Sequence, residues 1–553
     1  MFHDAREIPA GTQIDCDVVI VGSGAGGMPV ANELLNSSLD VVVLESGGFG
    51  SDAATLDLCR GEVLDPGHHA PLDGYRQRCY GGTTNTWGGR CAPHDPIDFE
   101  ARPYVPYSGW PITLGDLDPY YERAHVYCDV GQYNYKAAES LPRGNEPLIP
   151  GLKSDDVAQD WIWRFSLPSN FAKLSPAAFK TSPRMRVYLH ANCLGVQLNK
   201  EGNHVAGLRV ASLRLNHFTV RAKYYVLAAG GLEVPRILLS SRDICPAGVG
   251  NDRDLVGRFY CDHVAGDLCL VKFTPKGGPI IWNFETAHDG VYCRRALRIR
   301  EETQRREQVL NFRCYVAHPS MANPRHGDAI LSAGYLAKRF LIHKIPPEFD
   351  KALAGRMTPY KQVGPHMMNV LLGSPRLVGF SFVWLRKRIL ARRKLPAISM
   401  PNKNNIYNLH FDSEQSPNPD SRVMLGEEKD ALGMNRLRVD WRMTDRDIQS
   451  VLKCFRIISR AFRNSGVATM LEEEESIARE FPNRVGVGSH HYGTTRMAAD
   501  PSRGVVDPNC RVFGTDNLFI ATSSTFPTPS FANPVLSIVA LSLRLADHLK
   551  RLP

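Results

Sequence analysis

Short apolar runs followed by glycine clusters organise the first part of the chain. Residues 17–21 (DVVIV) form such a run, which is typical of a strand buried in a parallel sheet. Residues 22–27 (GSGAGG) follow, and a helical stretch then extends to about Asn36. A second apolar run, 41–44, ends in Glu45. This order predicts a unit of strand, glycine turn, helix and strand.

The glycines of this turn match the spacing G-x-G-x-x-G at Gly22, Gly24 and Gly27. Gly22 permits the tight turn, Gly24 lets a pyrophosphate approach the backbone, and Gly27 lets the helix pack close to the strand. The helix N-terminus offers unpaired N–H groups to the phosphates. Glu45 lies 23 residues after Gly22, where an acid meets the adenosine ribose and disfavours the 2′-phosphate of NADP. A glycine-rich surface turn does not explain why an acid stands at this spacing. The sequence therefore predicts a dinucleotide site.

A second unit of strand, glycines and helix lies further along the chain. Residues 224–229 (YYVLAA) are a buried-strand candidate, Gly230 and Gly231 follow, and a helix is expected over residues 232–240. We therefore expect the dinucleotide domain to resume here.

Within residues 267–483 the pattern changes to short alternating runs between turn clusters, which predicts an antiparallel sheet with helices. Strands are expected at 422–425 and 436–441. Thr444 is the expected N-cap of a helix that ends at Gly466. Further on, residues 517–521 read as a strand and residues 534–549 as a strongly apolar, buried helix.

Length and composition indicate a globular protein of two domains. The chain has 553 residues, of which 43% are hydrophobic and 22% charged. Its 13 cysteines include no C-x-x-C pair, which suits reduced thiols and argues against zinc or iron–sulfur sites on closely spaced thiolates. Residues 1–14 contain no apolar run, and no stretch approaches the roughly 18 to 20 apolar residues of a spanning helix. We therefore expect a cytoplasmic protein without a signal peptide.

The net charge of +9 is concentrated in one segment, Arg376–Lys394. This basic segment holds seven cations and no acid, so the rest of the chain carries only +2. Apolar residues lie between the cations, as in amphipathic segments that bind an anionic membrane or an acidic partner. The alternative is a solvated helix whose arginine stems cover the edge of a core. No repeat of basic and aromatic residues suggests a nucleic acid partner.

Two elements near the C-terminus carry candidate chemistry. His490 stands in residues 488–497 (GSHHYGTTRM), and Asn533 immediately precedes Pro534. Oxidation of an alcohol by a flavin needs a neutral base for the hydroxyl proton and a fixed donor for the oxygen, while hydride leaves for flavin N5. A helix that starts at Pro534 would also direct its dipole at the flavin C2 carbonyl, worth on the order of 0.3–2 kcal/mol.

Local reasoning leaves alternatives to both candidates. Asn before Pro is also a plain helix start, with Asn at N-cap and Pro at N1. A histidine in a glycine-rich loop is often structural, and His491 competes with His490 as the base. A third glycine-rich segment, residues 79–100, either lays short hydroxyls against a flat ligand or forms a surface loop.

Taken together, these motifs resemble the glucose–methanol–choline (GMC) family of flavoprotein oxidoreductases. The resemblance covers nearly the full length of the chain. Its motifs, in order, are GSGAGG (22–27) with Glu45, GGTTNTWGGR (81–90), AAGGLEVPRILLSS (228–241), DLVGRFYCDH (254–263), EQSPNPDSRVML (414–425), HHYGTTRM (490–497) and the final stretch 517–544.

The resemblance implies an α/β fold (α+β overall), with a discontinuous Rossmann-like FAD-binding domain and a substrate domain built on an antiparallel sheet. We assign residues 1–100, 185–266 and 484–553 to the FAD-binding domain, and residues 101–184 and 267–483 to the substrate domain.

The resemblance also implies the site residues. The family's catalytic histidine lies three residues before the glycine of G-T-x-R-M, which selects His490, and its partner before the last helix is Asn533. An asparagine there resembles the pyranose-oxidising branch. The expected cofactor-binding residues are Gly22, Ser23, Gly24, Ala25, Gly26, Gly27, Glu45, Ser46, Gly82, Thr83, Asn85, Thr86, Ala229, Asn533, Pro534 and Val535. No metal site is expected.

The chain departs from the family pattern at several places. Members with covalent flavin carry a histidine at the place of Thr86, and threonine cannot form that bond, so we expect dissociable FAD. The close-set cysteines of the cluster-bearing sugar dehydrogenases are missing, so that electron route is not expected. The basic segment has no counterpart in the family pattern.

The sequence thus predicts an enzyme that oxidises a CH–OH group of a sugar or sugar-bearing substrate, with O2 or an unidentified acceptor as the electron acceptor. One alternative is oxidation of a non-sugar or primary alcohol. Another is a non-redox lyase that keeps FAD on the same scaffold. A third is a membrane-docked binding protein with structural FAD, motivated by the basic segment.

Overall fold

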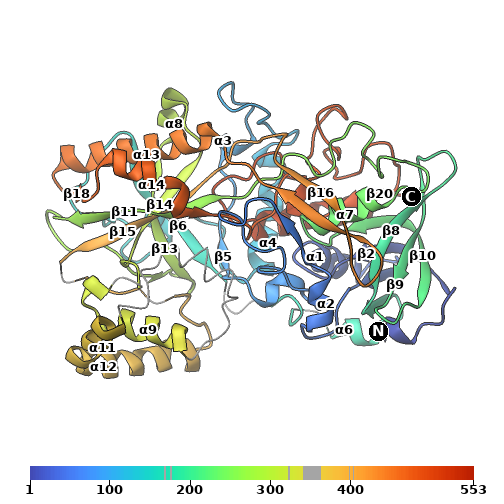
Figure 1. Cartoon of the computed structure of the whole chain (residues 1–553), viewed down its shortest axis with the longest axis horizontal. Helices are drawn as coiled ribbons and strands as arrows, with labels where there is room; N and C mark the ends of the chain where they lie inside the picture. The colour runs from blue at the N-terminus through green and yellow to red at the C-terminus, as the bar shows by residue number, and fades with distance from the viewer. Residues whose placement is uncertain (167–169, 175–176, 322–323, 341–362, 398, 403) are drawn as a thin grey trace.

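The structure is a computed structural model that describes every residue except 167–169, 175–176, 322–323, 341–362, 398 and 403. Its described strands form three sheets. Figure 1 shows the first sheet and both chain termini on the right, and the second sheet on the left. The architecture is α/β on the right and antiparallel β with helices on the left, as predicted.

The first, eight-stranded sheet is parallel at its centre. Its order is β1 (Phe2–Asp4), β7 (Met185–Leu189), β3 (Val41–Leu44), β2 (Gln13–Val21), β10 (His217–Leu227), β9 (Val205–Ala211) and β8 (Asn192–Leu198), with β20 (Leu518–Ile520) paired to β10. The pairs from β1 to β10 and the β10–β20 pair are parallel, whereas β8, β9 and β10 pair antiparallel.

The predicted strand–turn–helix–strand unit lies at the middle of this sheet. Strand β2 pairs with β3 in the register Val18↔Val41 to Val21↔Leu44, and helix α1 (Gly27–Leu34) connects them. The side chains of Val18, Val41 and their neighbours in the two strands are fully buried, which explains the uninterrupted apolar runs. Strand β10 and helix α7 (Glu233–Ser240) form the second predicted unit.

The second, nine-stranded sheet is antiparallel. Its order is β18 (Ala468–Met470), β11 (Val264–Phe273), β15 (Ile406–Ser413), β14 (Phe312–Ala317), β13 (Tyr292–Ile299), β6 (Val157–Phe165) and β5 (Arg90–Cys91), with β12 (Glu285–Thr286) on β13 and β19 (Val485–Gly486) on β11. Helices α13 (Asp445–Ser465) and α14 (Glu474–Arg484) lie along it (Figure 1).

Helix α13 has the boundaries that the sequence predicts. The Thr444 hydroxyl accepts a hydrogen bond from the Asp447 backbone N–H, and the Asp447 carboxylate reaches back to Thr444, which completes a capping box. At the other end Gly466 has a φ of +63°, the left-handed conformation that glycine adopts at low cost.

The third sheet joins segments from the two predicted domains. Strand β16 (Arg422–Lys429) includes the expected strand at 422–425, and β17 (Asn435–Asp440) covers the expected strand at 436–441 except for its last residue. They pair with each other and with β4 (Gly61–Val63), which lies in the segment assigned to the FAD-binding domain. The domain boundaries stay a prediction.

Two further groups of helices position the functional surfaces. Helix α15 (Val535–Leu549) is buried along most of its length and packs against α1 and α4 (Asp118–Tyr127). Helices α9 (Ala329–Phe340), α11 (Val363–Leu372) and α12 (Ser374–Trp384) form a separate layer at the lower left of Figure 1, on the side of the second sheet away from α13.

Candidate active site

The glycine turn after β2 is packed tightly everywhere except at one position. A Cβ on Gly26 would overlap the carbonyl oxygen of Ala521, and one on Gly27 would overlap that of Gly22. Gly22 itself has a φ of +100°. By contrast, a Cβ on Gly24 would meet no atom closer than 3.9 Å. The open position is the one that the motif reserves for a pyrophosphate, so the turn fits the predicted dinucleotide.

Glu45 lies buried at the end of β3, beside this turn. Its carboxylate accepts hydrogen bonds from the Ser23 N–H at 3.0 Å and hydroxyl at 2.6 Å, from the Gly47 N–H at 3.1 Å and from the Ser46 hydroxyl at 3.2 Å. Burial raises the pKa of Glu45, although these bonds oppose the rise. Four donors fill the roughly four lone-pair sites of a carboxylate. A ribose hydroxyl would therefore replace one of the two serine hydroxyls.

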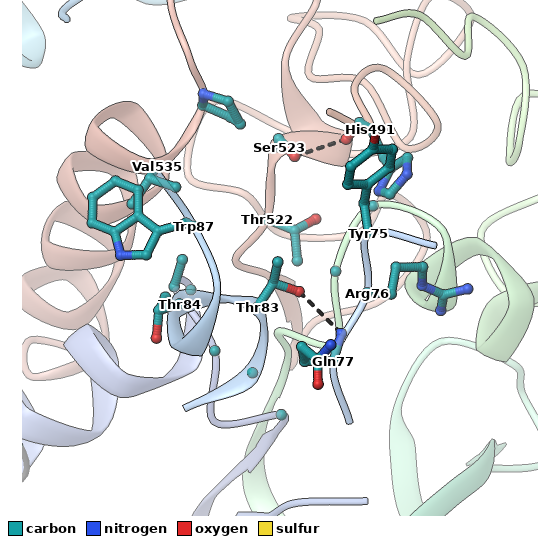
Figure 2. A pocket seen from close by; sticks show the side chains of 18 of the residues that line it. Tyr75, Arg76, Gln77, Thr83, Thr84, Trp87, His491, Thr522, Ser523 and Val535 are labelled. Atoms are coloured by element: carbon teal, nitrogen blue, oxygen red, sulfur yellow. Dashed lines mark hydrogen bonds between the residues drawn. The ribbon is translucent and has the colours of Figure 1, made fainter. Parts of the chain in front are cut away.

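The loop between residues 79 and 90 lies against the glycine turn, and its residues divide into two groups. Gly82, Thr83, Thr86 and Trp87 line the cavity, and Figure 2 shows Trp87 beside Val535 on one side of it. The Asn85 amide instead donates to the carbonyl oxygens of Tyr80 and Gly82, at 3.0 and 2.8 Å, and holds the loop together.

A cavity of about 1090 Å³ runs between the first and second sheets. This volume is slightly above the roughly 300–1,000 Å³ that is typical of ligand sites, which suits a large ligand. Every cofactor-binding residue predicted from the sequence lines the cavity except Gly27 and Asn85, and His490 and Asn533 line it as well. Figure 2 shows Tyr75 and His491 across the cavity from Trp87 and Val535.

His490 and Asn533 meet in this cavity through a short hydrogen bond. The Asn533 Nδ2 lies 3.1 Å from the His490 Nε2, and the Asn533 Oδ1 lies 2.6 Å from the Arg90 Nε. Arginine can only donate, so the oxygen of the amide must face Arg90 and its NH2 group must face His490. The Nε2 of His490 is therefore the acceptor and carries a lone pair, which is the form of a neutral base.

Arg90 is fixed in turn by Asp412 on β15. The guanidinium makes two parallel bonds to the carboxylate, at 2.9 and 2.7 Å, the geometry that best orients arginine. Burial lowers the pKa of Arg90, but the Asp412 charge outweighs it and the net shift is upward. The guanidinium also lies 5.3 Å from the centre of the Trp163 ring. The orientation of the Asn533 amide is thus set by the second sheet.

Asp262 holds the loop that carries His490. One carboxylate oxygen accepts from the backbone N–H groups of Gly488, Ser489 and His490, at 2.6, 3.0 and 3.1 Å. The other lies 3.6 Å from the His490 Nδ1, too long for a hydrogen bond but close enough to attract its proton. Burial would raise the pKa of Asp262, but the neighbouring His490 and these N–H groups lower it below its ordinary value. Asp262 is therefore an anion that favours a proton on Nδ1.

His491 has a different environment. Its Nε2 lies 3.3 Å from the carbonyl oxygen of Gly488, so this nitrogen carries the proton. Burial, and secondly the charge of Arg76, lower the pKa of His491 to about 3. Its backbone carbonyl accepts a hydrogen bond from the Ser523 hydroxyl at 2.7 Å, which Figure 2 draws. Of the two histidines, His490 is the one whose geometry suits a base.

Asp262, His263 and His490 place their ligand-type atoms within 4.8 Å of one another, as in a metal site. The Asp262 carboxylate, however, also accepts from the His263 N–H at 2.6 Å, which brings its backbone donors to four. A carboxylate that accepts from four N–H donors has few lone pairs left to bind a cation. The three residues are therefore better suited to orienting a base than to holding a metal ion.

The start of α15 corrects the simple capping interpretation of Asn533. Helix α15 begins at Val535 after Pro534, and no side chain caps it. The Asn533 amide is used by Arg90 and His490 instead. The first N–H groups of a helix have no partner within it, and Asn533, Pro534 and Val535 at this end line the cavity.

The residues that orient the pair were missed by sequence reasoning. Arg90 ends the motif GGTTNTWGGR, and Asp262 stands in DLVGRFYCDH, so both lay in quoted motifs without a role. Asp412 gave no signal, because a polar residue that alternates with apolar ones in a strand usually faces solvent.

Comparisons with known proteins agree with this architecture. Residues 417–542 match the family model described as GMC oxidoreductase. The chain is 25% identical to 6'''-hydroxyparomomycin C oxidase of Streptomyces lividus, over 96% of this chain and 92% of that protein. It is 22% identical to the fructose dehydrogenase large subunit of Gluconobacter japonicus, over 97% of each.

A solved structure, pyridoxine 4-oxidase from Mesorbium loti, shares the fold with a TM-score of 0.51 and 18% identity, and the match covers 96% of this chain and 99% of that one. The family model over residues 417–542, the relatives matched along nearly the full chain and the fold of the solved structure all agree with the resemblance to GMC oxidoreductases that the sequence motifs indicate.

Proposed function

We propose that this protein is an FAD-dependent oxidoreductase that converts a CH–OH group of a sugar or sugar-bearing substrate to a carbonyl. The observation that carries the proposal is the His490–Asn533 pair, whose hydrogen bond to Arg90 leaves a lone pair on the His490 Nε2 inside the cavity. When bound, FAD supplies the hydride acceptor.

In this proposal the substrate hydroxyl displaces the Asn533 N–H from the single lone pair of the His490 Nε2, and His490 then removes the hydroxyl proton through that nitrogen. The Asn533 amide has a second N–H, which holds the same oxygen in line, so that base and donor act on one hydroxyl. Once His490 has gained the proton it is a cation, and the buried Asp262 anion near its Nδ1 stabilises that charge.

The residues of the glycine turn, the 82–86 loop and the start of α15 would hold the cofactor. Thr86 is exposed to the cavity and its hydroxyl lies 3.3 Å from the carbonyl oxygen of Thr83. Threonine is not a side chain that forms the histidyl bond to flavin, so we propose dissociable FAD. Acid precipitation should leave the yellow colour in the supernatant, whereas colour retained in the protein pellet would contradict dissociable binding.

The wall that the second sheet contributes supports a hydroxyl-rich substrate. Trp163 and Phe165 supply flat apolar surface, and Arg294, Tyr315 and His410 supply polar groups that line the same cavity. The Arg294 guanidinium lies 3.9 Å from the centre of the Tyr315 ring, which fixes its direction. Two of the relatives are named 6'''-hydroxyparomomycin C oxidase and fructose dehydrogenase large subunit, names that agree with such a substrate.

The proposal is tested by mixing the purified, FAD-loaded protein anaerobically with sugars, aminoglycosides and simple alcohols. We expect a substrate of the first two classes to bleach the flavin, and recovery of the colour in air would identify O2 as the acceptor. A protein that neither holds nor takes up FAD would contradict the proposal. Turnover of a substrate with no bleaching would contradict it too, and would favour the lyase alternative.

A further inference from the structure

The basic segment and the helix before it form an exposed apolar hairpin. We define the hairpin as α11, α12 and the π-helical turn Leu385–Leu390 that continues α12. It contains eleven of the twenty-two large apolar side chains that stand exposed in the described part of the chain. Leu372 is 78% exposed, Leu390 is 71% exposed and Phe382 is 69% exposed. Exposed apolar clusters of this kind mark a surface that something else covers.

The hairpin is attached to the molecule by its inner side. Leu377 and Phe380 pack on a small cluster that includes Ile330 and Leu331 of α9. The buried His366 places its Nδ1 3.0 Å from the Ser332 hydroxyl. These contacts fix the hairpin on α9, so its outer apolar side chains are presented to the outside and not folded onto the core.

The charges of the hairpin and of the residues after it are all positive. Residues 363–394 contain no acid. Arg376 and Arg393 form ion pairs with Asp328 and Asp129, at 3.0 and 2.7 Å. Other cations of the basic segment form no ion pair with any described residue, among them Arg386, Lys387, Arg392 and Lys394. An unbalanced positive field therefore surrounds the apolar surface.

We propose that the hairpin docks this protein on an anionic lipid bilayer, with its apolar side chains in the interface and its cations at the headgroups. Apolar insertion combined with cations is how interfacial helices bind such surfaces. In the described residues no single helix is long and apolar enough to span a membrane, and α11 meets the α12 helix at a bend of 82°. That geometry suits a segment that enters the interface and returns.

Charge complementarity favours a bilayer over a second copy of this chain. Two hairpins that met face to face would bring the same four cations together with no acid of the hairpin to offset them. The negative headgroups of an anionic membrane would balance these cations directly.

The hairpin is connected to the catalytic cavity by a short segment. Near the end of the basic segment, Arg393 donates to the carbonyl oxygens of Asp129 and Phe165, at 3.1 and 3.3 Å. Pro396 and Ala397, a few residues further on, line the cavity. Docking of the hairpin therefore holds one wall of the cavity near the bilayer surface.

Flotation of the full-length, FAD-loaded protein with vesicles tests the proposal. Vesicles of equal parts phosphatidylcholine and phosphatidylglycerol should carry the protein to the top of the gradient, and pure phosphatidylcholine should carry much less. Raising the salt from about 0.1 M to about 1 M shortens the screening length from about 10 Å to about 3 Å and should weaken the binding.

Trp384, which is 39% exposed, should shift its fluorescence emission to the blue when the protein binds the vesicles, and Trp384→Phe should remove that shift.

Two sets of variants separate the apolar and charged contributions. Replacing Arg386, Lys387, Arg392 and Lys394 by Gln should lower the vesicle partition by on the order of a hundredfold or more. The matched control replaces four exposed cations elsewhere, namely Lys180, Lys200, Arg253 and Arg551. Phe382→Ser with Leu390→Ser should lower the partition by about tenfold or more. Its matched control is Leu215→Ser with Ile244→Ser, at positions that are 57% and 44% exposed.

Flavin content and reduction of the flavin by a soluble substrate should stay unchanged in all of these variants, which shows that they fold. Failure of the native protein to float with the anionic vesicles would overturn the proposal. Equal losses in the hairpin variants and in their controls would overturn it as well. So would a stable dimer that Phe382→Ser dissociates in the absence of vesicle binding, because the hairpin would then be a contact between copies. These readouts do not depend on the identity of the sugar substrate.

Discussion

The cavity and the hairpin differ in whether the chain itself supplies contact partners for their side chains. Around the cavity the chain satisfies its own polar groups: the Asp262 carboxylate has four backbone donors, and Arg90 is bonded to both Asp412 and Asn533. In the hairpin, large apolar side chains such as Leu372 stay exposed. The cavity is therefore preorganised by the chain itself, whereas the hairpin leaves an apolar surface exposed, which we propose a bilayer covers.

This contrast makes the cavity sensitive to single substitutions and the hairpin tolerant of them. Buried groups that lose a partner cost their full desolvation energy, while exposed apolar residues lose little when they become polar. The predictions below start with the largest expected effect.

Gly26→Ala should break the glycine turn. The new Cβ would overlap the backbone carbonyl of Ala521, which cannot move without shifting β20. We expect loss of bound FAD and a fall of several kcal/mol, about 3–5, in the free energy of unfolding. Denaturant unfolding and flavin absorbance measure both effects.

Gly24→Ala is the matched control for that substitution, because a Cβ there would make only an ordinary van der Waals contact, with the Gly82 Cα at 3.9 Å. It should leave the stability of the cofactor-free protein within about 1 kcal/mol and weaken FAD binding alone. Equal destabilisation by the two substitutions would contradict the packing described here.

Asp262→Asn should lower the rate of flavin reduction by roughly 10²–10⁴-fold, since an amide no longer favours the proton on the His490 Nδ1. Single-turnover mixing measures the rate. The native pKa of Asp262 is below its ordinary value, so its contribution to stability is present above about pH 4 and is lost as the pH falls towards the native pKa.

The stability of the native protein should therefore fall more steeply than that of Asp262→Asn as the pH is lowered below about 4. Parallel curves for the two proteins would show that this carboxylate does not carry the acid dependence.

Arg90→Lys should have a smaller effect, about 10–100-fold on flavin reduction. Lysine cannot make the paired bonds to Asp412 and also donate to the Asn533 oxygen, so the amide loses its fixed direction. The pH at which the rate is half-maximal should change little, because His490 remains. A rate equal to that of the native protein would mean that the amide orientation does not depend on Arg90.

Phe382→Ser should have the smallest effect on folding. The side chain is 69% exposed, so we expect a change of less than about 0.5 kcal/mol in the free energy of unfolding without lipid. A loss of several kcal/mol would mean that the hairpin is part of the core.

The sequence was most informative where the signal is local. The glycine turn and the helix from Thr444 to Gly466 follow from residues close together in the chain. The second helix has the predicted boundaries, whereas α1 after the glycine turn ends at Leu34, two residues before the expected end near Asn36. The family resemblance selected His490 and Asn533, and the structure brings them within 3.1 Å.

The parts that the sequence did not predict depend on long-range contacts. Arg90 and Asp412 are more than three hundred residues apart, on strands β5 and β15, and only assembly of the second sheet brings them together. The apolar pattern of the hairpin is the same whether the residues face a core or the outside. The sequence therefore left a membrane surface and a solvated helix at a core edge as alternatives, and the side-chain exposures of the hairpin favour the first.

The account depends most on the assignment of the base to His490 and not to His491. The direct measurement is the anaerobic rate of flavin reduction by one substrate in His490→Ala and in His491→Ala, with FAD content checked in both. We expect His490→Ala to lower the rate by about 10²–10⁴-fold and His491→Ala to stay within about tenfold of the native rate. A native rate in His490→Ala would contradict the central claim.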